Sequence, residues 1–214
     1  MKVNSKKISL IFLLFSISLL SSQKDQSKLI SPLDIPLAIS GTFGEIRSSH
    51  FHAGLDIKTG GKQGLKVRTV LDGSVSRIRV STTGYGKAVY IDHPNGTTSV
   101  YAHLKNFSPK IESYIKEAQY EKESYVIEKF PKNELAVLKG EVIGFSGNTG
   151  GSSGPHLHFE IRDTKNQMPF NPMIFNIDVV DTKKPVIKKL FLFHENNFGE
   201  DIKIQKIKLE KISD

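Results

Sequence analysis

The feature that most constrains the fold is a series of short apolar runs separated by turn residues. Between residues 31 and 174 such runs occupy 73–81, 88–91, 97–104, 141–145 and 157–161. Alternation of apolar and polar side chains within them is typical of strands that bury one face. Helical segments do not alternate with these runs, so a parallel sheet of βαβ units is not expected. The sequence therefore predicts a mainly β, antiparallel domain.

One hairpin is marked directly by its turn residues. The segment 93–96, which ends in Asn95-Gly96, separates the runs 88–91 and 97–104. Asn and Gly both tolerate positive φ, and this pair between alternating runs is a strong hairpin signal. We therefore expect these two strands to be adjacent and antiparallel.

Residues 109–133 depart from the β pattern. The segment is charged, and Ile111, Tyr114, Ile115 and Ala118 recur at helical spacing. We interpret it as a helical insertion between strands. Such an excursion is either a surface decoration or a partial lid beside a cleft.

The first 22 residues have the composition of a secretory signal peptide. Lys2, Lys6 and Lys7 form a basic start, a 13-residue apolar run follows at 8–20, and two small serines precede Gln23. A membrane anchor is the alternative, but a span needs about 20 apolar residues. We therefore predict export to the periplasm, the cell envelope or the exterior, with no stable membrane insertion after the signal is removed.

Three parts are expected along the chain: a signal at 1–22, a main domain at 23–175 and a β-rich extension at 176–214. A polar linker at 181–185 precedes two strand-like runs in the extension. The extension is too short for a separate domain. It is either a truncated second β unit or a pair of strands that pack on the main domain.

Composition excludes several classes of function. The chain has no cysteine, which excludes a disulfide scaffold, a Cys-ligated zinc site and a thiol nucleophile. Its formal charge is +8, but no basic stripe with interleaved aromatics indicates a nucleic-acid partner. The Gly-rich run at 147–154 lacks the Lys-Ser/Thr of a phosphate loop. We interpret that run as a mobile loop that delivers His156.

The first group of candidate site residues lies at 50–56. His52 and Asp56 are four residues apart, and Gly54 between them favours a turn into a strand rather than a helix. Imidazole nitrogen and carboxylate oxygen are both normal zinc ligands. Alone, the pair is weak evidence for a metal site, because a hydrogen bond between these two side chains near the surface is the more common arrangement.

The second group contains His156 and His158, which share one face if their segment is a strand. Two imidazoles on an apolar strand are costly to bury unless something binds them. Together with His52 and Asp56 they can supply a catalytic type of metal site, with three protein ligands and one open position. His103, near the end of the run 97–104, would add an acid or base beside it.

These motifs resemble those of the lysostaphin/LytM-type zinc metallopeptidases, which cleave peptidoglycan. The resemblance rests on H-x-x-x-D at 52–56, Y-A-H-L at 101–104 and G-x-x-G-P-H-L-H-F-E at 151–160, and it covers about residues 31–175. The helical insertion is the main departure. The resemblance implies an antiparallel β-sheet or sandwich of the duplicated hybrid motif type, with 23–175 as the peptidase domain.

The resemblance also implies residue roles and a function. His52, Asp56 and His158 would bind one Zn²⁺ per chain, while His103 and His156 would act at the reacting centre as base and oxyanion stabiliser, in an order left open. The implied function is a secreted zinc metalloendopeptidase that hydrolyses peptide bonds in peptidoglycan stems or cross-bridges, with a zinc-activated water as nucleophile.

Two alternatives remain open. A non-catalytic wall-binding or amidase-activating module of the same fold would not need the complete ligand set. A structural zinc site would need four closed ligands, and His50, His103 or His156 would have to supply the fourth.

Overall fold

The computed structural model describes residues 29–180, 190–194 and 203–207. The predicted signal peptide at 1–22 lies outside these residues. The chain divides into two units between Val180 and Asp181, and each is described by itself. No helix in the described part of the chain combines the length and the apolar character that a membrane span requires.

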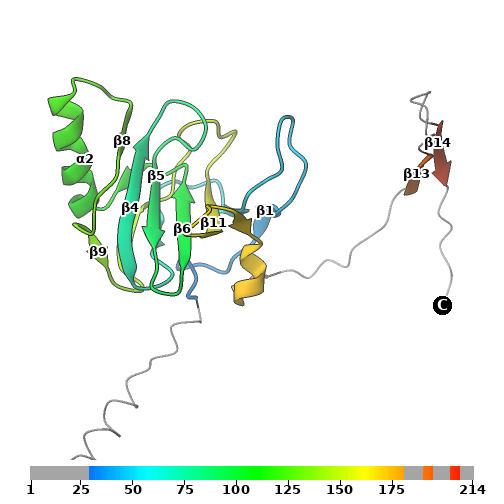
Figure 1. Cartoon of the computed structure of the whole chain (residues 1–214), viewed down its shortest axis with the longest axis horizontal. Helices are drawn as coiled ribbons and strands as arrows, with labels where there is room; N and C mark the ends of the chain where they lie inside the picture. The colour runs from blue at the N-terminus through cyan, green and yellow to red at the C-terminus, as the bar shows by residue number, and fades with distance from the viewer. Residues whose placement is uncertain (1–28, 181–189, 195–202, 208–214) are drawn as a thin grey trace, which may run out of the picture. The chain divides into compact units, whose positions relative to one another are not determined.

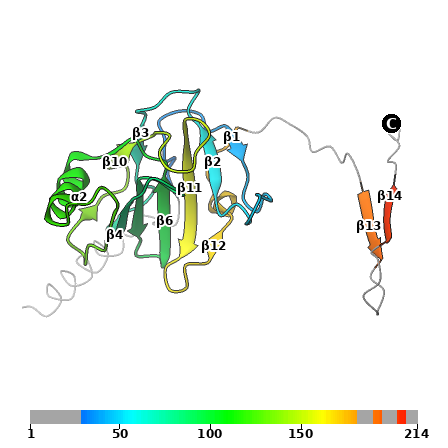
Figure 2. The same cartoon turned by 90° about the horizontal axis from the view of Figure 1, so that it is seen from above.

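The first unit is built on a large antiparallel sheet (Figures 1 and 2). Its strands run in the order β1 (Ile39–Gly41), β2 (Leu55–Lys58), β11 (His156–Asp163), β6 (Thr97–Ala102), β5 (Ala88–Asp92), β4 (Gly73–Val80) and β8 (Ile127–Lys129). Two further strands lie off this path, since β12 (Pro169–Phe170) pairs with β11 and β9 (Ala136–Val137) pairs with β4. Every pair of strands in the sheet is antiparallel, as the sequence predicts.

A smaller sheet shares its core with the large one. It has the order β3 (Lys66–Arg68), β10 (Val142–Phe145) and β7 (Asn106–Phe107). Val67 and Ile143 of this sheet belong to the same buried cluster as Ile57 and Phe159 of the large sheet. The two sheets therefore enclose one hydrophobic core, which fits the predicted sheet or sandwich class.

Alternation along β11 separates the core from the candidate site. Leu157 and Phe159 are fully buried in the core cluster. Because successive residues of a strand point to opposite faces, His156 and His158 lie on the other face. The sequence predicts this division, and the register adds that His158 faces Asp56 on β2 and Ala102 on β6.

The predicted hairpin joins β5 and β6, and its turn differs in detail from a two-residue loop. Gly96 has φ of +80°, whereas Asn95 does not share this conformation. The side-chain oxygen of Asn95 instead accepts a hydrogen bond from the Thr97 N–H at 3.1 Å. The His93 N–H donates to the Thr97 carbonyl at 2.8 Å and closes the longer turn.

The helical insertion is part of the core. Helix α2 (Pro109–Glu121) buries Ile111, Ile115 and Ala118, which lie on one face at helical spacing. It packs beside β7 and β8. Strand β8 is the edge strand at the end of the large sheet opposite to β1 and β2. The structure confirms the predicted helix and gives it a packing role.

The described residues of the second unit, 190–194 and 203–207, form one strand pair. β13 (Leu190–His194) and β14 (Lys203–Ile207) are antiparallel, with Leu190 opposite Ile207. Both lie in the two runs of the extension that have a strand-like pattern. In the first unit, Ile177 is buried and the Val180 N–H donates to the Leu37 carbonyl at 2.8 Å. Residues 177–180 thus pack with the first unit, beyond the domain end expected at 175.

Gly54 lies where the chain enters β2 against β11. A Cβ at this position would be 2.2 Å from the Phe159 carbonyl oxygen and 2.7 Å from Glu160 Cγ. We predict that Gly54→Ala lowers the free energy of unfolding by about 1–3 kcal/mol, because the two backbones must separate. Urea unfolding of the full chain measures the change.

Gly154→Ala is the matched control, since a Cβ there would meet no heavy atom within 4 Å. A Gly-to-Ala change at a compatible site alters stability by less than about 1 kcal/mol. Equal losses in the two variants would show that close approach of β2 and β11 does not require Gly54.

Candidate metal centre

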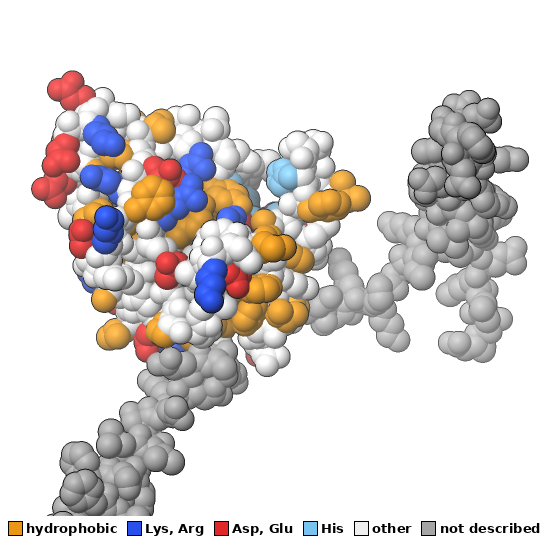
Figure 3. Space-filling view, in the orientation of Figure 1, with side chains coloured by type: hydrophobic (Ala, Val, Ile, Leu, Met, Phe, Trp, Pro, Cys, Tyr) orange, Lys and Arg blue, Asp and Glu red, His pale blue; other side chains and the backbone are white. Residues whose placement is uncertain are grey.

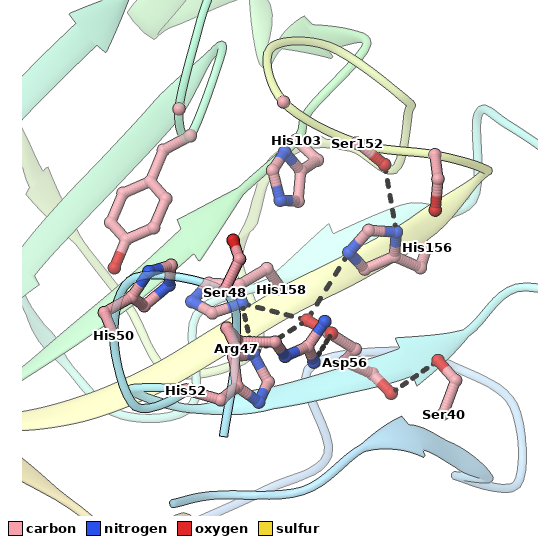
Figure 4. A pocket seen from close by; sticks show the side chains of 14 residues that line it. Ser40, Arg47, Ser48, His50, His52, Asp56, His103, Ser152, His156 and His158 are labelled. Carbon is pink, nitrogen blue, oxygen red and sulfur yellow. Dashed lines mark hydrogen bonds and ion pairs between the residues drawn. The ribbon is translucent and has the colours of Figure 1, made fainter. Parts of the chain in front are cut away.

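Three buried side chains converge beside the paired strands β2 and β11 (Figure 4). His52 precedes β2, Asp56 lies within β2, and His158 lies opposite Asp56 on β11. His52 Nε2 is 3.1 Å from Asp56 Oδ1 and 3.0 Å from His158 Nδ1, and His158 Nδ1 is 2.9 Å from Asp56 Oδ1. One point is thus within reach of all three ligand atoms.

The outer nitrogens of the two imidazoles are held by acceptors. His52 Nδ1 is 2.8 Å from the Thr42 carbonyl oxygen, and His158 Nε2 is 2.7 Å from Glu160 Oε1. Neither oxygen can donate, so each of these nitrogens carries the ring proton. His52 Nε2 and His158 Nδ1 then present lone pairs to each other and to the Asp56 carboxylate. The lone pairs of His52 Nε2, His158 Nδ1 and Asp56 Oδ1 repel one another unless a cation lies between them.

This donor set fits zinc. Zinc binds imidazole nitrogen and carboxylate oxygen at about 2.0–2.2 Å in tetrahedral geometry, which separates neighbouring ligand atoms by about 3.3 Å. The observed separations of 2.9–3.1 Å are close to that value. His52, Asp56 and His158 therefore form a candidate metal site with three protein ligands.

Asp56 is kept ionised by its surroundings. Burial raises the pKa of its carboxyl, but the contacts with His156, His158 and His52 outweigh burial and hold that pKa well below its usual range. Arg47 Nη2 lies 2.8 Å from Asp56 Oδ2, whereas His52 and His158 contact Oδ1. The arginine leaves Oδ1 as the ligand atom.

His103 lies at the end of β6 in a strained conformation. Its φ is +56°, a left-handed backbone that a non-glycine residue rarely adopts. The His103 N–H donates to the Tyr85 carbonyl at 2.9 Å, and its Nδ1 is 2.8 Å from the Thr149 carbonyl oxygen. Burial lowers the pKa of His103 to about 4, despite the opposing hydrogen bond to Thr149. The ring is therefore neutral, with its Nε2 lone pair free of the backbone.

His156 begins β11 and faces the same point. Its Nδ1 is 2.8 Å from the Gly154 carbonyl oxygen, and its Nε2 is 3.4 Å from Asp56 Oδ1. Burial lowers the pKa of His156, but the contacts with Asp56 and Gly154 raise it above its ordinary value. The ring centroids of His103 and His156 are 4.7 Å apart. Two further histidines thus adjoin the candidate metal site.

All five residues line one pocket of about 510 Å³. Histidine side chains reach the surface on this side of the first unit (Figure 3). The pocket walls come from the loops around residues 47–50, 84–85 and 151–153, and no residue of 109–133 lines it. The helical segment thus lacks the position of a lid. His50 is exposed at the rim and stands outside the three-residue cluster.

The sequence suggests that the Gly-rich run at 147–154 is a mobile loop, but hydrogen bonds hold it on both sides. The Gly151 N–H donates to the Gly84 carbonyl at 2.7 Å, and the Thr149 hydroxyl donates to the Leu104 carbonyl at 2.9 Å. A Cβ on Gly150 would be 2.3 Å from the Gly86 backbone nitrogen. The run therefore holds the acceptor for His103 as well as delivering His156.

Several residues of the site are not singled out by the sequence motifs as functional. Thr42 and Thr149 act through backbone carbonyls, and Arg47 comes from a loop without periodicity. Glu160 is different, because strand alternation places it on the face of His158. That period offers a signal by which the residue can be found from sequence.

Comparison with known proteins identifies the family. Residues 50–120 and 128–172 match the model of Peptidase family M23, which is more than half of the chain. The chain therefore belongs to peptidase family M23. This match confirms the resemblance to lysostaphin/LytM-type metallopeptidases that the motifs indicate.

The curated relatives are longer proteins. DD-carboxypeptidase/endopeptidase Mpg of Neisseria meningitidis serogroup B is 36% identical over 149 residues, which are 67% of this chain and 28% of that protein. The cell division protein DipM of Caulobacter vibrioides is 27% identical over 124 residues, 58% of this chain and 16% of that protein. The chain thus spans less than a third of the length of these relatives.

Solved structures share the fold. A zinc-containing peptidase from Vibrio cholerae aligns with a TM-score of 0.50 and 24% identity, over 66% of this chain and 38% of that one. The SpoIIQ–SpoIIIAH pore-forming complex aligns with a TM-score of 0.52 and 22% identity, over 72% of this chain and 93% of that one. At these identities the likeness concerns the fold alone.

We predict that the purified chain takes up about one zinc, as a site with three protein ligands does. His52→Ala, Asp56→Ala and His158→Ala should each reduce occupancy greatly, because each removes one of the three ligand atoms. Elemental analysis after dialysis against limiting zinc measures the content. Full metal content in all three variants would reject this ligand set.

Proposed function

We propose that this member of peptidase family M23 is a zinc metalloendopeptidase that hydrolyses peptide bonds in peptidoglycan stems or cross-bridges. The observation that carries the proposal is the complete set in one pocket: three converging ligand side chains with His103 and His156 beside them. The name of the Neisseria relative, a DD-carboxypeptidase/endopeptidase, supports the substrate class. The proposed cofactor is one Zn²⁺ per chain, held by His52, Asp56 and His158.

The proposed chemistry divides between metal and protein. When bound, zinc supplies Lewis-acid chemistry: it polarises a carbonyl and lowers the pKa of a water molecule to about 7. The protein contributes two imidazoles whose Nδ1 atoms are held by the Thr149 and Gly154 carbonyls. Each ring therefore exchanges protons with the pocket through Nε2 only.

His103 and His156 are proposed as the catalytic residues. One accepts a proton from the attacking water, and the other stabilises the oxyanion that develops on the substrate carbonyl. Their ring centroids are 4.7 Å apart, so both rings face the same part of the pocket. A positioned acid or base of this kind contributes roughly 10²–10⁴-fold to the rate.

The two alternative functions fit the residues of the pocket less well. A wall-binding or amidase-activating module requires no convergent ligand set. A structural zinc site requires a fourth protein ligand, but His50 is exposed at the rim. Among the described residues, the cluster of converging ligand atoms contains His52, Asp56 and His158 and includes neither His103 nor His156.

The proposed setting follows from the substrate. An enzyme of peptidoglycan acts outside the cytoplasm, in the periplasm, the cell envelope or the exterior. Export by a signal peptide at 1–22, with a peptidase domain at 23–175 and an extension at 176–214, stays a prediction. Peptidoglycan is the proposed partner, and neither nucleic acid nor stable membrane insertion after signal removal is expected.

We predict that the chain without residues 1–22 releases soluble peptide fragments from purified peptidoglycan. Removal of zinc by a chelator should abolish release, and added zinc should restore it, because the three ligands act through the ion. Mass spectrometry of the fragments identifies the bond. Binding to peptidoglycan without release of fragments would contradict the proposal. Release by protein from which the chelator has removed the metal would also contradict it.

The two catalytic histidines should separate from the ligands. His103→Ala and His156→Ala are expected to keep zinc while kcat falls at least about 10²-fold, since they act on protons and charge. Metal content and hydrolysis are measured on the same samples, with His158→Ala as the comparison that loses both. If either variant lost zinc as His158→Ala does, that histidine would be a ligand.

A further inference from the structure

A carboxylate that the proposed mechanism does not use lies behind the candidate metal centre. Glu160 follows His158 by two residues on β11 and shares its face, and its side chain is fully buried. Glu160 Oε1 accepts hydrogen bonds from His158 Nε2 at 2.7 Å and from the Tyr85 hydroxyl. Glu160 Oε2 accepts a hydrogen bond from Arg162 Nε. A buried charge with three donors is fully paired.

The donors around Glu160 also fix its orientation. Arg162 holds Oε2, so Oε1 is turned toward the imidazole of His158. Arg162 Nη2 lies 3.2 Å from the Tyr85 hydroxyl oxygen, and the guanidinium lies 5.9 Å from the centre of the Tyr90 ring. These contacts hold the carboxylate between the ligand histidine and the arginine.

His158 lies between two carboxylates, which compete for the single ring proton when the imidazole is neutral. Asp56 Oδ1 is 2.9 Å from Nδ1, and Glu160 Oε1 is 2.7 Å from Nε2. If the proton moved to Nδ1, it would donate to Asp56 and block the lone pair that faces His52. If the proton stays on Nε2, Nδ1 remains open to a cation. The position of this proton therefore decides whether the site can accept a metal.

We propose that Glu160 is the positioning residue of the metal centre, which keeps the proton of His158 on Nε2 and so directs the Nδ1 lone pair toward the metal. The inference rests on the proposed function only for the identity of the metal. It concerns metal binding and not cleavage. Partners of this kind behind a ligand histidine typically contribute 10–100-fold to metal affinity.

The first test compares two charge-neutralising variants. Glu160→Gln removes the charge behind His158. Arg162 can only donate, so it takes the amide oxygen in place of Oε2, and the amide NH2 then faces His158 Nε2 and the Tyr85 hydroxyl. Glu128→Gln is the matched control, because Glu128 also pairs with an arginine of the large sheet, Arg77 Nε at 2.7 Å, but far from the ligands.

Zinc affinity is measured by competition with a chromophoric chelator. We expect a 10–100-fold loss in Glu160→Gln and less than about a 2-fold change in Glu128→Gln. The second readout is the ring nitrogen shifts of His158 by NMR in metal-free protein, at a pH where the ring is neutral. The wild type should show the Nε2–H tautomer, and Glu160→Gln should shift toward Nδ1–H. A role in folding alone would lower stability without moving the tautomer.

Loss of the pair can leave Arg162 without its partner and unfold the single variant. The double variant Glu160→Gln/Arg162→Gln removes both charges and serves as the second test. Unchanged zinc affinity and an unchanged His158 tautomer in either folded variant would overturn the proposal. If the wild type binds zinc with this dependence on Glu160 but does not cleave peptidoglycan, the proposed function fails and the positioning role stands.

Discussion

The candidate site depends on the register of β2 against β11. Asp56 lies opposite His158 in this pairing, and the next pair along buries Ile57 and Leu157 in the core. A slip of one residue would turn every side chain of a strand to the other face, exchanging ligands for core residues. Burial of the apolar face therefore fixes the ligands on the opposite face. The close approach at Gly54 lets the chain enter this register beside the Phe159 backbone.

Hydrogen-bond acceptors, mostly backbone carbonyls, orient the histidine rings that the strand register brings together. Three of the four site histidines donate a ring proton to a carbonyl oxygen, and the fourth, His158, donates to Glu160. Burial raises the pKa of the Glu160 carboxyl, but His158 and Arg162 outweigh it and set that pKa at about 2. A permanent anion thus lies behind the cluster. Each imidazole consequently turns one defined nitrogen toward the pocket.

The sequence predicts the parts of this arrangement that side chains encode. Alternation places His156 and His158 on one face, and Asn95-Gly96 marks the hairpin that leads to His103. The sequence does not predict the roles of the Thr42 and Thr149 carbonyls. Every residue has a backbone carbonyl, and its direction depends on the conformation of the loop. Strands of two or three residues, such as β7 and β9, are also missed because they are too short to show a period.

Helix α2 shows where local pattern stops being informative. The spacing of Ile111, Ile115 and Ala118 predicts a helix with one apolar face. It does not say which surface that face will cover, because β7 and β8, although close to the helix in sequence, are too short to be predicted from a period. The pattern alone allows a surface decoration or a lid beside the cleft. In the structure the helix packs beside β7 and β8, and no residue of 109–133 lines the pocket.

The ligands and the proposed catalytic histidines are built on different kinds of support. Asp56 and His158 sit within paired strands, whereas His103 and His156 lie where β6 ends and β11 begins. The loops that hold these two rings are joined, since the Gly151 N–H donates to Gly84 in the loop whose Tyr85 carbonyl accepts the His103 N–H. The strained φ of His103 persists because its neighbours on both sides are held in this way. A substitution in either loop should therefore reduce the rate of proton transfer more than it reduces the affinity for metal.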